Sequence, residues 1–508
     1  MEFNSYIWQL YRDSSEGSMA IDTYSNLLEN VNKGQFKLTL ATSPVNTSNL
    51  DWELINSFIE TYSSRIIKDL SEAENLFNEV VSYIIEGGGD INDEEEPVLV
   101  DAADILYILP ELSMAFNQCF PEYFFPYFFR GHFYLFEEIC EIFTITLPEL
   151  PKKKHYDQRL AYYFELCRAL YEFRKSSNLS PAELSAFLYS FAQNFISVAQ
   201  DNVLPKPLKV WIVGGGINQN GDFEYLDGID DHAVTSWQGN IDTRRGDIVL
   251  VYCLSPRSYI HSIWRAKTDG YIDPFFYFYN QVWLCNPIKT THITYDDLRN
   301  DPLLSQNSLV KCSMQGLNGR RFNYREYEAI LSIMESKGQD LSKLPRVEPV
   351  FEISDGKNLL VDERDVEIYL VEPLLEKLGY ENEDWTRQMT VRMGRGEKLY
   401  PDYAFFAQQN KGEEQARMVL ETKYRIKTNK ELFNAYSQAK SYALRLQSTA
   451  FVVAAIEGIW IFPLQKSGFE FETNLHKTWK EVYQPDIFSA IIDVIGKQAI
   501  KKKKTRNI

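Results

Sequence analysis

Two short apolar runs near residue 400 place three charged side chains on what should be neighbouring strands. Asp402 opens the first run, and Glu421 and Lys423 lie in the second. Residues i and i+2 of a strand face the same side, so Glu421 and Lys423 should project together. The polar segment 408–415 between the runs predicts a hairpin loop, which would bring Asp402 beside Glu421.

This arrangement predicts a metal site. Two neighbouring carboxylates repel each other unless a cation lies between them. Hard oxygen ligands that leave coordination positions open suit Mg²⁺, with Mn²⁺ as a substitute. An ammonium group two residues further on can stabilise developing phosphate charge or position the attacking water. We therefore expect Mg²⁺ at Asp402 and Glu421 and a catalytic role for Lys423.

The pair Pro401-Asp402 followed by Glu421-Thr422-Lys423 resembles the motif of the PD-(D/E)xK nuclease superfamily. The flanking elements strengthen the resemblance. A helical run from Glu363 ends at Gly379, a typical helix stop. Downstream, Gln438 and Tyr442 resemble the QxxxY element of several such nucleases.

The order of elements over about residues 350–465 is similar to the N-terminal nuclease domain of type I restriction enzyme motor subunits. Thr428 and Glu431 form a potential capping box, and Glu457-Gly458 between two apolar runs signals a hairpin. We expect the nuclease domain over residues 359–465. No helicase motor follows, so the resemblance covers the nuclease module alone.

The resemblance implies a role for each site residue. Asp402 and Glu421 would hold the metal, Lys423 would activate or orient the water, and Gln438 would position the site. Glu363 and Glu367 share a helix face, and either could assist the metal. The resemblance favours Glu363, which lies ten residues before Pro373, with Glu367 as the alternate. The plain alternatives are ordinary charges at a sheet edge or a nuclease fold without activity.

The composition excludes several classes of protein. With 508 residues, 44% hydrophobic and 24% charged, the chain is that of a globular protein with more than one domain. A net charge of −18 argues against unspecific binding of polyanions. Basic residues nevertheless gather around the site and in the tail 501–506. Local charge therefore leaves a nuclease open.

The spacing of the cysteines and the length of the apolar runs bear on the cellular location of the protein. The six cysteines show no CxxC spacing, which predicts neither a zinc site nor a disulfide framework. A reducing, cytoplasmic setting fits this pattern. No run approaches the ~20 apolar residues of a membrane span. We also expect no signal peptide, because the chain does not open on a charged and then apolar leader.

Residues 1–204 predict a mostly helical region of unknown role. Helices are expected over 156–175 and 180–200, the second with a cap at Ser180 and a proline in its first turn. The segment 120–143 is very rich in Phe and Tyr. The stronger interpretation is a buried core helix with a wide apolar face, and the alternative is a binding surface for bases or a partner.

Residues 208–333 predict a compact, barrel-like domain of many short strands with interspersed helices. The segment resembles the EVE domains, which are related to the YTH domains of the PUA-like group. Five phrases in order carry this resemblance: Lys209-Val210-Trp211-Ile212-Val213, Trp237-Gln238-Gly239-Asn240, Arg245 to Tyr252, Tyr271-Ile272-Asp273-Pro274 and Asp301-Pro302-Leu303-Leu304.

The EVE resemblance implies a pocket that reads modified bases in DNA or RNA. A flipped base stacks on indole faces while polar groups read its edge. Trp237 and Asn240 match the pocket segment, and Asp273 and Phe275 fall where a second wall would come. The chain departs from the family pattern around 276–279. The remaining tryptophans of the segment predict core positions: Trp211, Trp264 and Trp283.

The whole chain predicts a multidomain α+β protein. It would comprise the helical region, the EVE-like reader, a polar linker over 334–358, the α/β restriction-endonuclease-like domain and a helix-rich segment with a basic tail over 466–508. A reader joined to a nuclease suggests a modification-dependent restriction endonuclease that acts on modified DNA in anti-phage defence. Cleavage of both strands suggests a homodimer. The alternatives are a nucleic-acid-binding protein whose nuclease is idle or partner-activated, and a nuclease acting on RNA or DNA ends.

Overall fold

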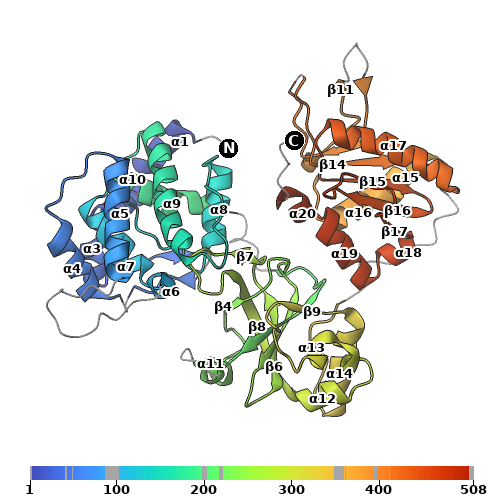
Figure 1. Ribbon diagram of the computed structural model, residues 1–508, viewed down its shortest axis with the longest axis horizontal. Coiled ribbons are helices and arrows are strands. Elements are labelled where there is room, and N and C mark those ends of the chain that lie inside the picture. Colours follow the sequence, from blue (N-terminus) through green and yellow to red (C-terminus); the bar gives the residue numbers. More distant parts are fainter. Residues whose placement is uncertain are drawn as a thin grey trace. The chain divides into compact units, whose positions relative to one another are not determined.

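The computed structural model describes residues 3–40, 43–47, 50–85, 102–196, 203–216, 221–347, 360, 362–392, 398–410 and 412–502. The protein is a mixed structure of helices and strands in two compact units (Figure 1). The first unit takes 1–205, 212–289 and 315–320, and the second takes 206–211, 290–314 and 321–508. The chain therefore passes from one unit to the other five times.

The expected helical region and most of the expected EVE-like segment fall in the same unit. Among the described residues, the α-helices of the first unit are α1 (Ser5–Arg12), α2 (Ser15–Ser25), α3 (Leu27–Asn32), α4 (Trp52–Tyr62), α5 (Leu70–Ile85), α6 (Ala102–Ile105), α7 (Leu109–Cys119), α8 (Phe133–Ile142), α9 (Tyr156–Ser176), α10 (Pro181–Ala186) and α11 (Asp222–Gly228). A short hairpin of β1 (Thr39–Leu40) and β2 (Ser43–Pro44) accompanies them. The helical nature of the N-terminal region is thus confirmed.

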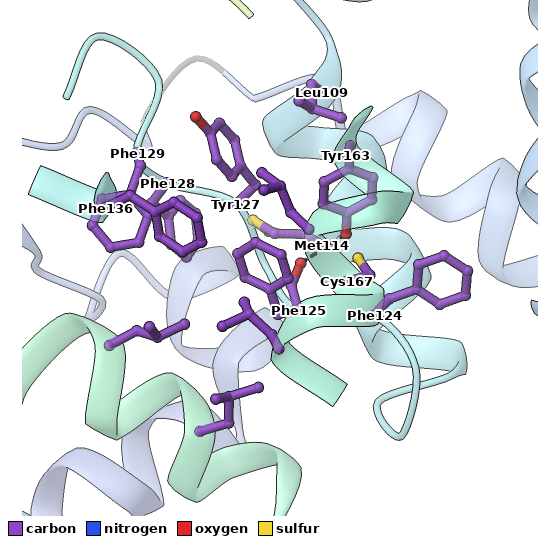
Figure 2. Close-up of a cluster of buried hydrophobic side chains, with 14 of the residues drawn as sticks. Leu109, Met114, Phe124, Phe125, Tyr127, Phe128, Phe129, Phe136, Tyr163 and Cys167 are labelled. Carbon is purple, nitrogen blue, oxygen red and sulfur yellow. Dashed lines mark hydrogen bonds between the residues drawn. The ribbon is translucent and has the colours of Figure 1, made fainter. Parts of the chain in front are cut away.

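The aromatic segment 120–143 forms the core of this helical region (Figure 2). Most of its rings are buried, and Tyr127, Phe129 and Phe133 have no exposed surface. The prediction of a core is confirmed, but the prediction of one helix is wrong. The part before α8 is irregular, and buried hydroxyl groups satisfy its backbone: Tyr163 donates to the Phe125 carbonyl and Ser113 accepts from the Tyr127 amide.

One sheet carries the strand-rich segment, in the order β4-β8-β6-β5-β3-β9 with β7 paired to β8. Its strands are β3 (Val210–Gly215), β4 (Thr235–Gln238), β5 (Ile248–Cys253), β6 (Tyr259–Ala266), β7 (Tyr271–Ile272), β8 (Asn280–Thr294) and β9 (Arg320–Phe322). The sheet curls, because Asn318 before β9 donates to Gln238 of β4 at the opposite edge. Trp211 and Trp264 are buried, as expected.

The second unit is built on a sheet in the order β10-β13-β14-β15-β16-β17. Its strands, with the separate pair β11 and β12, are β10 (Trp385–Arg387), β11 (Val391–Arg392), β12 (Lys398–Leu399), β13 (Tyr403–Phe405), β14 (Met418–Thr422), β15 (Ala450–Ala455), β16 (Gly458–Pro463) and β17 (Leu475–Lys477). Its helices are α12 (Tyr295–Asn300), α13 (Ser308–Lys311), α14 (Tyr324–Ser336), α15 (Glu363–Val366), α16 (Glu372–Lys377), α17 (Asn429–Arg445), α18 (Trp479–Val482), α19 (Pro485–Ile495) and α20 (Lys497–Lys502).

Helices cover both faces of this sheet (Figure 1). The α17 face buries Val419, Phe451 and Val453, and the other face buries Leu420 and Val452 against α16 and α19. β14 and β15 are parallel and α17 connects them, whereas β13 with β14 and β15 with β16 form antiparallel pairs. Both expected hairpins are confirmed.

The expected local signals of the second unit are also present. Thr428 and Glu431 form the capping box of α17. The run from Glu363 is helical to Lys377 with a π-helical turn over Glu367–Val371, and Gly379 follows it with a φ of +87°. β17 and α18–α20 continue the same sheet and core, since Trp479 and Phe488 are buried in it. The expected boundary at residue 465 therefore falls inside this unit.

The linker expected over 334–358 and the basic tail lie partly outside the described residues. No helix of the described chain is both long enough and apolar enough to cross a membrane.

Candidate active site

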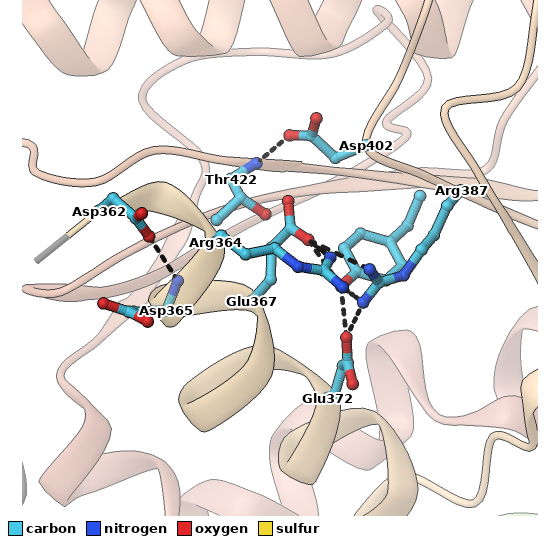
Figure 3. Close-up of polar contacts among 9 residues, drawn as sticks. Asp362, Arg364, Asp365, Glu367, Glu372, Arg387, Asp402 and Thr422 are labelled. Carbon is cyan, nitrogen blue, oxygen red and sulfur yellow. Dashed lines mark hydrogen bonds and ion pairs between the residues drawn. The ribbon is translucent and has the colours of Figure 1, made fainter. Parts of the chain in front are cut away.

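The register of β13 and β14 brings Asp402 and Glu421 together. Tyr403 pairs with Leu420, so the preceding residue, Asp402, comes opposite Glu421. The Asp402 Oδ2 atom accepts a hydrogen bond of 2.7 Å from the backbone N–H of Thr422 (Figure 3). Both carboxylates lie on the sheet face that α17 covers, since they alternate with residues of the opposite core. The predicted neighbourhood of the two acids is thus present.

Glu421 is a buried carboxylate that is only half satisfied. Its residue is 2% exposed, and Oε1 accepts a hydrogen bond of 2.7 Å from Lys423 Nζ. The other oxygen, Oε2, is buried without a hydrogen-bond partner among the described residues. Burial raises the pKa of Glu421 to about 7, and the charge of Asp402 acts in the same direction. A cation or a proton at Oε2 would offset the free-energy cost of burying the charged carboxylate.

Lys423 is the cation of the cluster. Burial alone would lower its pKa, but the hydrogen bond to Glu421 and the charges of Glu421, Glu363 and Asp402 raise the pKa overall. The ammonium therefore stays protonated at neutral pH. Burial also raises the pKa of Asp402, although the Thr422 amide and Lys423 oppose that shift.

The helix from Glu363 contributes a third carboxylate, and the structure separates the two candidates. The pKa of Glu363 is raised first by burial and then by the charges of Asp402 and Glu367, while Lys423 opposes the rise. Glu363 therefore lies within the electrostatic reach of the pair Asp402 and Lys423. Its part in holding a metal stays a prediction.

Glu367 is held in a different network (Figure 3). Its carboxylate pairs with Arg364, and its Oε2 lies 3.5 Å from Nη1 of Arg387. Arg387 also pairs with Glu372 and donates 2.8 Å to the Tyr403 hydroxyl. Arg364 of the helix and Arg387 of β10 thus both contact Glu367, so this carboxylate links the helix to β10.

Gln438 lies on α17, exposed, and donates a hydrogen bond of 2.9 Å to the hydroxyl of Tyr442 one turn later. Burial raises the pKa of Tyr442, and the charges of Glu421, Lys423 and Asp402 act on the same hydroxyl. The charges of the cluster thus reach the hydroxyl that Gln438 contacts. The i, i+4 spacing of the two residues was the sequence signal for this contact.

The donor set suits a divalent metal in its chemistry. Buried carboxylate oxygens are hard ligands, and the unpartnered Glu421 Oε2 offers a free position for one. Among the described residues, no group of three or more His, Cys, Asp or Glu side chains is already arranged to hold an ion.

Trp237 and Asn240 belong to one corner of the curled sheet. Trp237 is half-buried, its Nε1 donates 3.0 Å to the Gly214 carbonyl, and its ring lies 6.5 Å from that of Tyr225. Asn240 donates from Nδ2 to the Gly319 carbonyl and accepts at Oδ1 from the Asp242 amide. The indole is thus partly accessible, while both polar ends of the Asn240 amide serve the local backbone.

Asp273 and Phe275, expected in the second pocket wall, pack instead against the helical region. Asp273 is fully buried and accepts from the backbone N–H groups of Gly131 and Phe275. Burial raises its pKa to about 6. The Phe275 ring is also fully buried, 4.8 Å from that of Tyr127. The structure therefore does not join these two residues to Trp237 and Asn240 in one open pocket.

The sequence did not predict the ion pairs of Arg387 with Glu367 and Glu372. Arg387 and Glu372 lie in separate elements, and no spacing within the chain connects them. The sequence around Pro373 indicated the helix but not the strand β10 that supplies Arg387.

Comparison with known proteins gives no family for this chain. No family model matches the sequence, and no curated protein matches it. Among solved structures, Rpa0253 from Rhodopseudomonas palustris, determined by NMR, is 19% identical with a TM-score of 0.22. The match covers 27% of this chain and 99% of that one. A similarity at this level assigns neither fold nor function.

Proposed function

We propose that the protein is a metal-dependent endonuclease that cleaves DNA containing modified bases, in defence against phage. The observation that carries the proposal is the convergence of Asp402, Glu421 and Lys423, with Glu363 in electrostatic reach. Ordinary sheet-edge charges would lie in solvent, whereas Glu421 is almost fully buried beside a second acid. Such an arrangement is costly to fold and is typical of functional sites.

Each residue has a definite part in phosphodiester hydrolysis. Asp402, Glu421 and Glu363 would hold Mg²⁺, which when bound supplies Lewis-acid stabilisation of the phosphate and its leaving oxygen. Lys423, kept protonated by its neighbours, would orient the attacking water and offset charge on the phosphate oxygens. Tyr442 and Gln438 would fix the α17 side of the site.

The strand-rich segment would supply the choice of substrate. Trp237 presents a partly accessible indole on which a flipped base could stack. Asp273 and Phe275 are left out of this part of the proposal, because both are buried in the core. Cleavage of both strands would bring two active sites together, which suggests a homodimer.

The test is a cleavage assay in Mg²⁺ on matched DNA that is unmodified, cytosine-methylated, hydroxymethylated or glucosylated, with RNA alongside. We expect cutting of a modified DNA that is lost in Glu421→Gln and in Lys423→Met. Glu472→Gln and Lys480→Met are matched controls, because both residues are exposed in the same unit. Unchanged melting temperatures would show that the inactive variants still fold.

The outcomes separate the alternatives. Activity that survives both site variants would refute the catalytic assignment. Equal cutting of all DNA substrates would support the nuclease assignment and contradict the base-reading role of the strand-rich segment. Preference for RNA would assign the RNA alternative, and binding of modified DNA without cutting in Mg²⁺ or Mn²⁺ would favour a binding protein with an idle nuclease.

A further inference from the structure

A cavity in the first unit lies between the helical region and the outer face of β4 and β8. Its volume is about 420 Å³, and its walls come from the loop after β2, the start of α7, the segment before α8 and the strand pair. That volume is in the range of small-molecule sites. Ser236 lines it, so the neighbouring Trp237 faces the other side of β4. The cavity is therefore distinct from the corner around Trp237.

Gly131 fixes one wall of the cavity. Its amide donates 2.6 Å to Asp273, and its carbonyl accepts from the Tyr271 hydroxyl and from Trp283 Nε1. Its φ of +76° is one that residues with a Cβ rarely adopt. Both backbone polar groups of this residue are thus tied to the sheet, and the wall is preformed.

Three buried polar atoms of the lining have no hydrogen-bond partner among the described residues. They are Glu111 Oε2 and both ring nitrogens of His132, a residue that is 7% exposed. Leaving such atoms unpaired in the folded protein costs free energy. Burial lowers the pKa of His132 to about 4, so its neutral ring offers one donor and one acceptor. Water could satisfy one of these atoms, but three atoms around one cavity also form the edge of a recognition site.

The remaining lining supplies flat walls and one cation. The rings of His132 and Trp283 lie 4.7 Å apart at 33°, and Phe276 and Tyr107 add further aromatic surface. Arg130 is the cation among the described lining residues, with its guanidinium 4.5 Å from the centre of the Tyr107 ring and a hydrogen bond to the Tyr107 carbonyl. A guanidinium matches the geometry of a phosphate group.

We propose that this cavity binds a mononucleotide, with the base among the aromatic walls and its edge on Glu111 and His132, and the phosphate on Arg130. Aromatic walls accept the face of any base, and the unpartnered Glu111 oxygen and the neutral His132 ring on the same lining can pair with ring N–H and acceptor groups. This assignment is independent of the proposed nuclease, whose residues lie in the other unit.

The experiment is isothermal titration calorimetry of the full chain with AMP, GMP, CMP and UMP, without divalent cations. We expect at least one nucleotide to bind with a Kd below ~1 mM. The corresponding nucleoside and inorganic phosphate alone should each bind at least roughly tenfold more weakly. The Glu421→Gln protein should bind equally well, since its change lies in the other unit.

Two variants decide the site. Glu111→Gln keeps the shape of the side chain, and Arg130→Met removes the cation; each should weaken binding roughly tenfold or more. Glu172→Gln, at an exposed position of α9, is the matched control and should bind like the unmodified protein. Absence of binding by all four nucleotides, equal binding by phosphate alone, or unchanged affinity in a folded Glu111→Gln protein would overturn the proposal.

Discussion

Lys423 Nζ lies 2.7 Å from Oε1 of Glu421, while Oε2 of the same carboxylate is buried without a hydrogen-bond partner among the described residues. One ammonium therefore satisfies half of a buried acid. The other half must take up a proton or a cation, or remain unpaired at a cost in stability. This asymmetry leads to a measurable dependence on pH.

In a chelator, the second unit should lose stability as pH rises through the titration of Glu421. Its folded-state pKa of about 7 exceeds the ordinary 4.5, so between those values the folded protein binds more protons than the unfolded chain. Glu421→Gln removes this titration. Relative to the unmodified protein, we expect the variant to gain ~2 kcal/mol between pH 5 and pH 8. Urea unfolding at both pH values measures it.

The control for this titration is Glu472→Gln, which changes an exposed acid and should follow the unmodified protein at every pH. Addition of Mg²⁺ at pH 8 should stabilise the unmodified protein and leave Glu421→Gln nearly unchanged, because ligands stabilise only the form that binds them. Parallel pH profiles for the two Gln variants would contradict the assignment.

Glu363→Gln and Glu367→Gln make the same chemical change four residues apart, yet they should differ. Glu363 feels the charges of Asp402 and Lys423, so its loss should slow cleavage roughly 10–100-fold with little change in stability. Glu367 pairs with Arg364 and Arg387 at a partly exposed position, so its loss should cost ~1 kcal/mol of stability. Single-turnover cleavage rates and melting temperatures separate the two; the reverse pattern would exchange their roles.

Phe275→Ala should act on the core of the first unit. The ring is fully buried against Tyr127, and truncation of a buried Phe costs about 3–5 kcal/mol. Trp237→Phe loses one hydrogen bond to the Gly214 carbonyl and should cost only ~1 kcal/mol. Thermal unfolding compares the two. A stable Phe275→Ala protein with altered binding of modified DNA would instead return Phe275 to the pocket.

Glu414→Gln should destabilise the second unit at neutral pH but not in acid. Backbone N–H groups of Glu414 and Gly412, followed by Arg392 and Arg445, lower the pKa of this carboxyl to about 2. The stabilisation is therefore present above the ordinary pKa and is lost as pH falls toward 2. Melting temperatures of the variant and the unmodified protein should converge over that range, and a constant difference would argue against the ion pairs.

Local signals made the second unit the most predictable part of the chain. The Asp402 and Glu421 contact follows from one hairpin, the start of α17 from the Thr428 cap, and the end of α16 from Gly379. Each of these depends on residues close together in the sequence. The different surroundings of Glu363 and Glu367 could not be predicted, because Arg387, which pairs with Glu367, lies in a separate strand.

Contacts between distant segments explain the failed expectations. The aromatic stretch after Cys119 has a strong apolar pattern, but Pro121, Pro126 and Gly131 interrupt helical hydrogen bonding before α8. Asp273 and Phe275 suited a pocket wall by sequence, yet their partners Gly131 and Tyr127 precede them by more than a hundred residues. Neither contact is reflected in a periodic pattern of the sequence.

The five passages of the chain between the two units mean that neither unit is a contiguous gene segment. The six residues 206–211 belong to the second unit although they precede most of the strand-rich segment, and buried Lys209 forms an ion pair there with Asp493 of α19. A truncation after residue 333 would remove Asp493 and with it this ion pair of the buried Lys209. No single cut in the chain therefore separates one unit from the other.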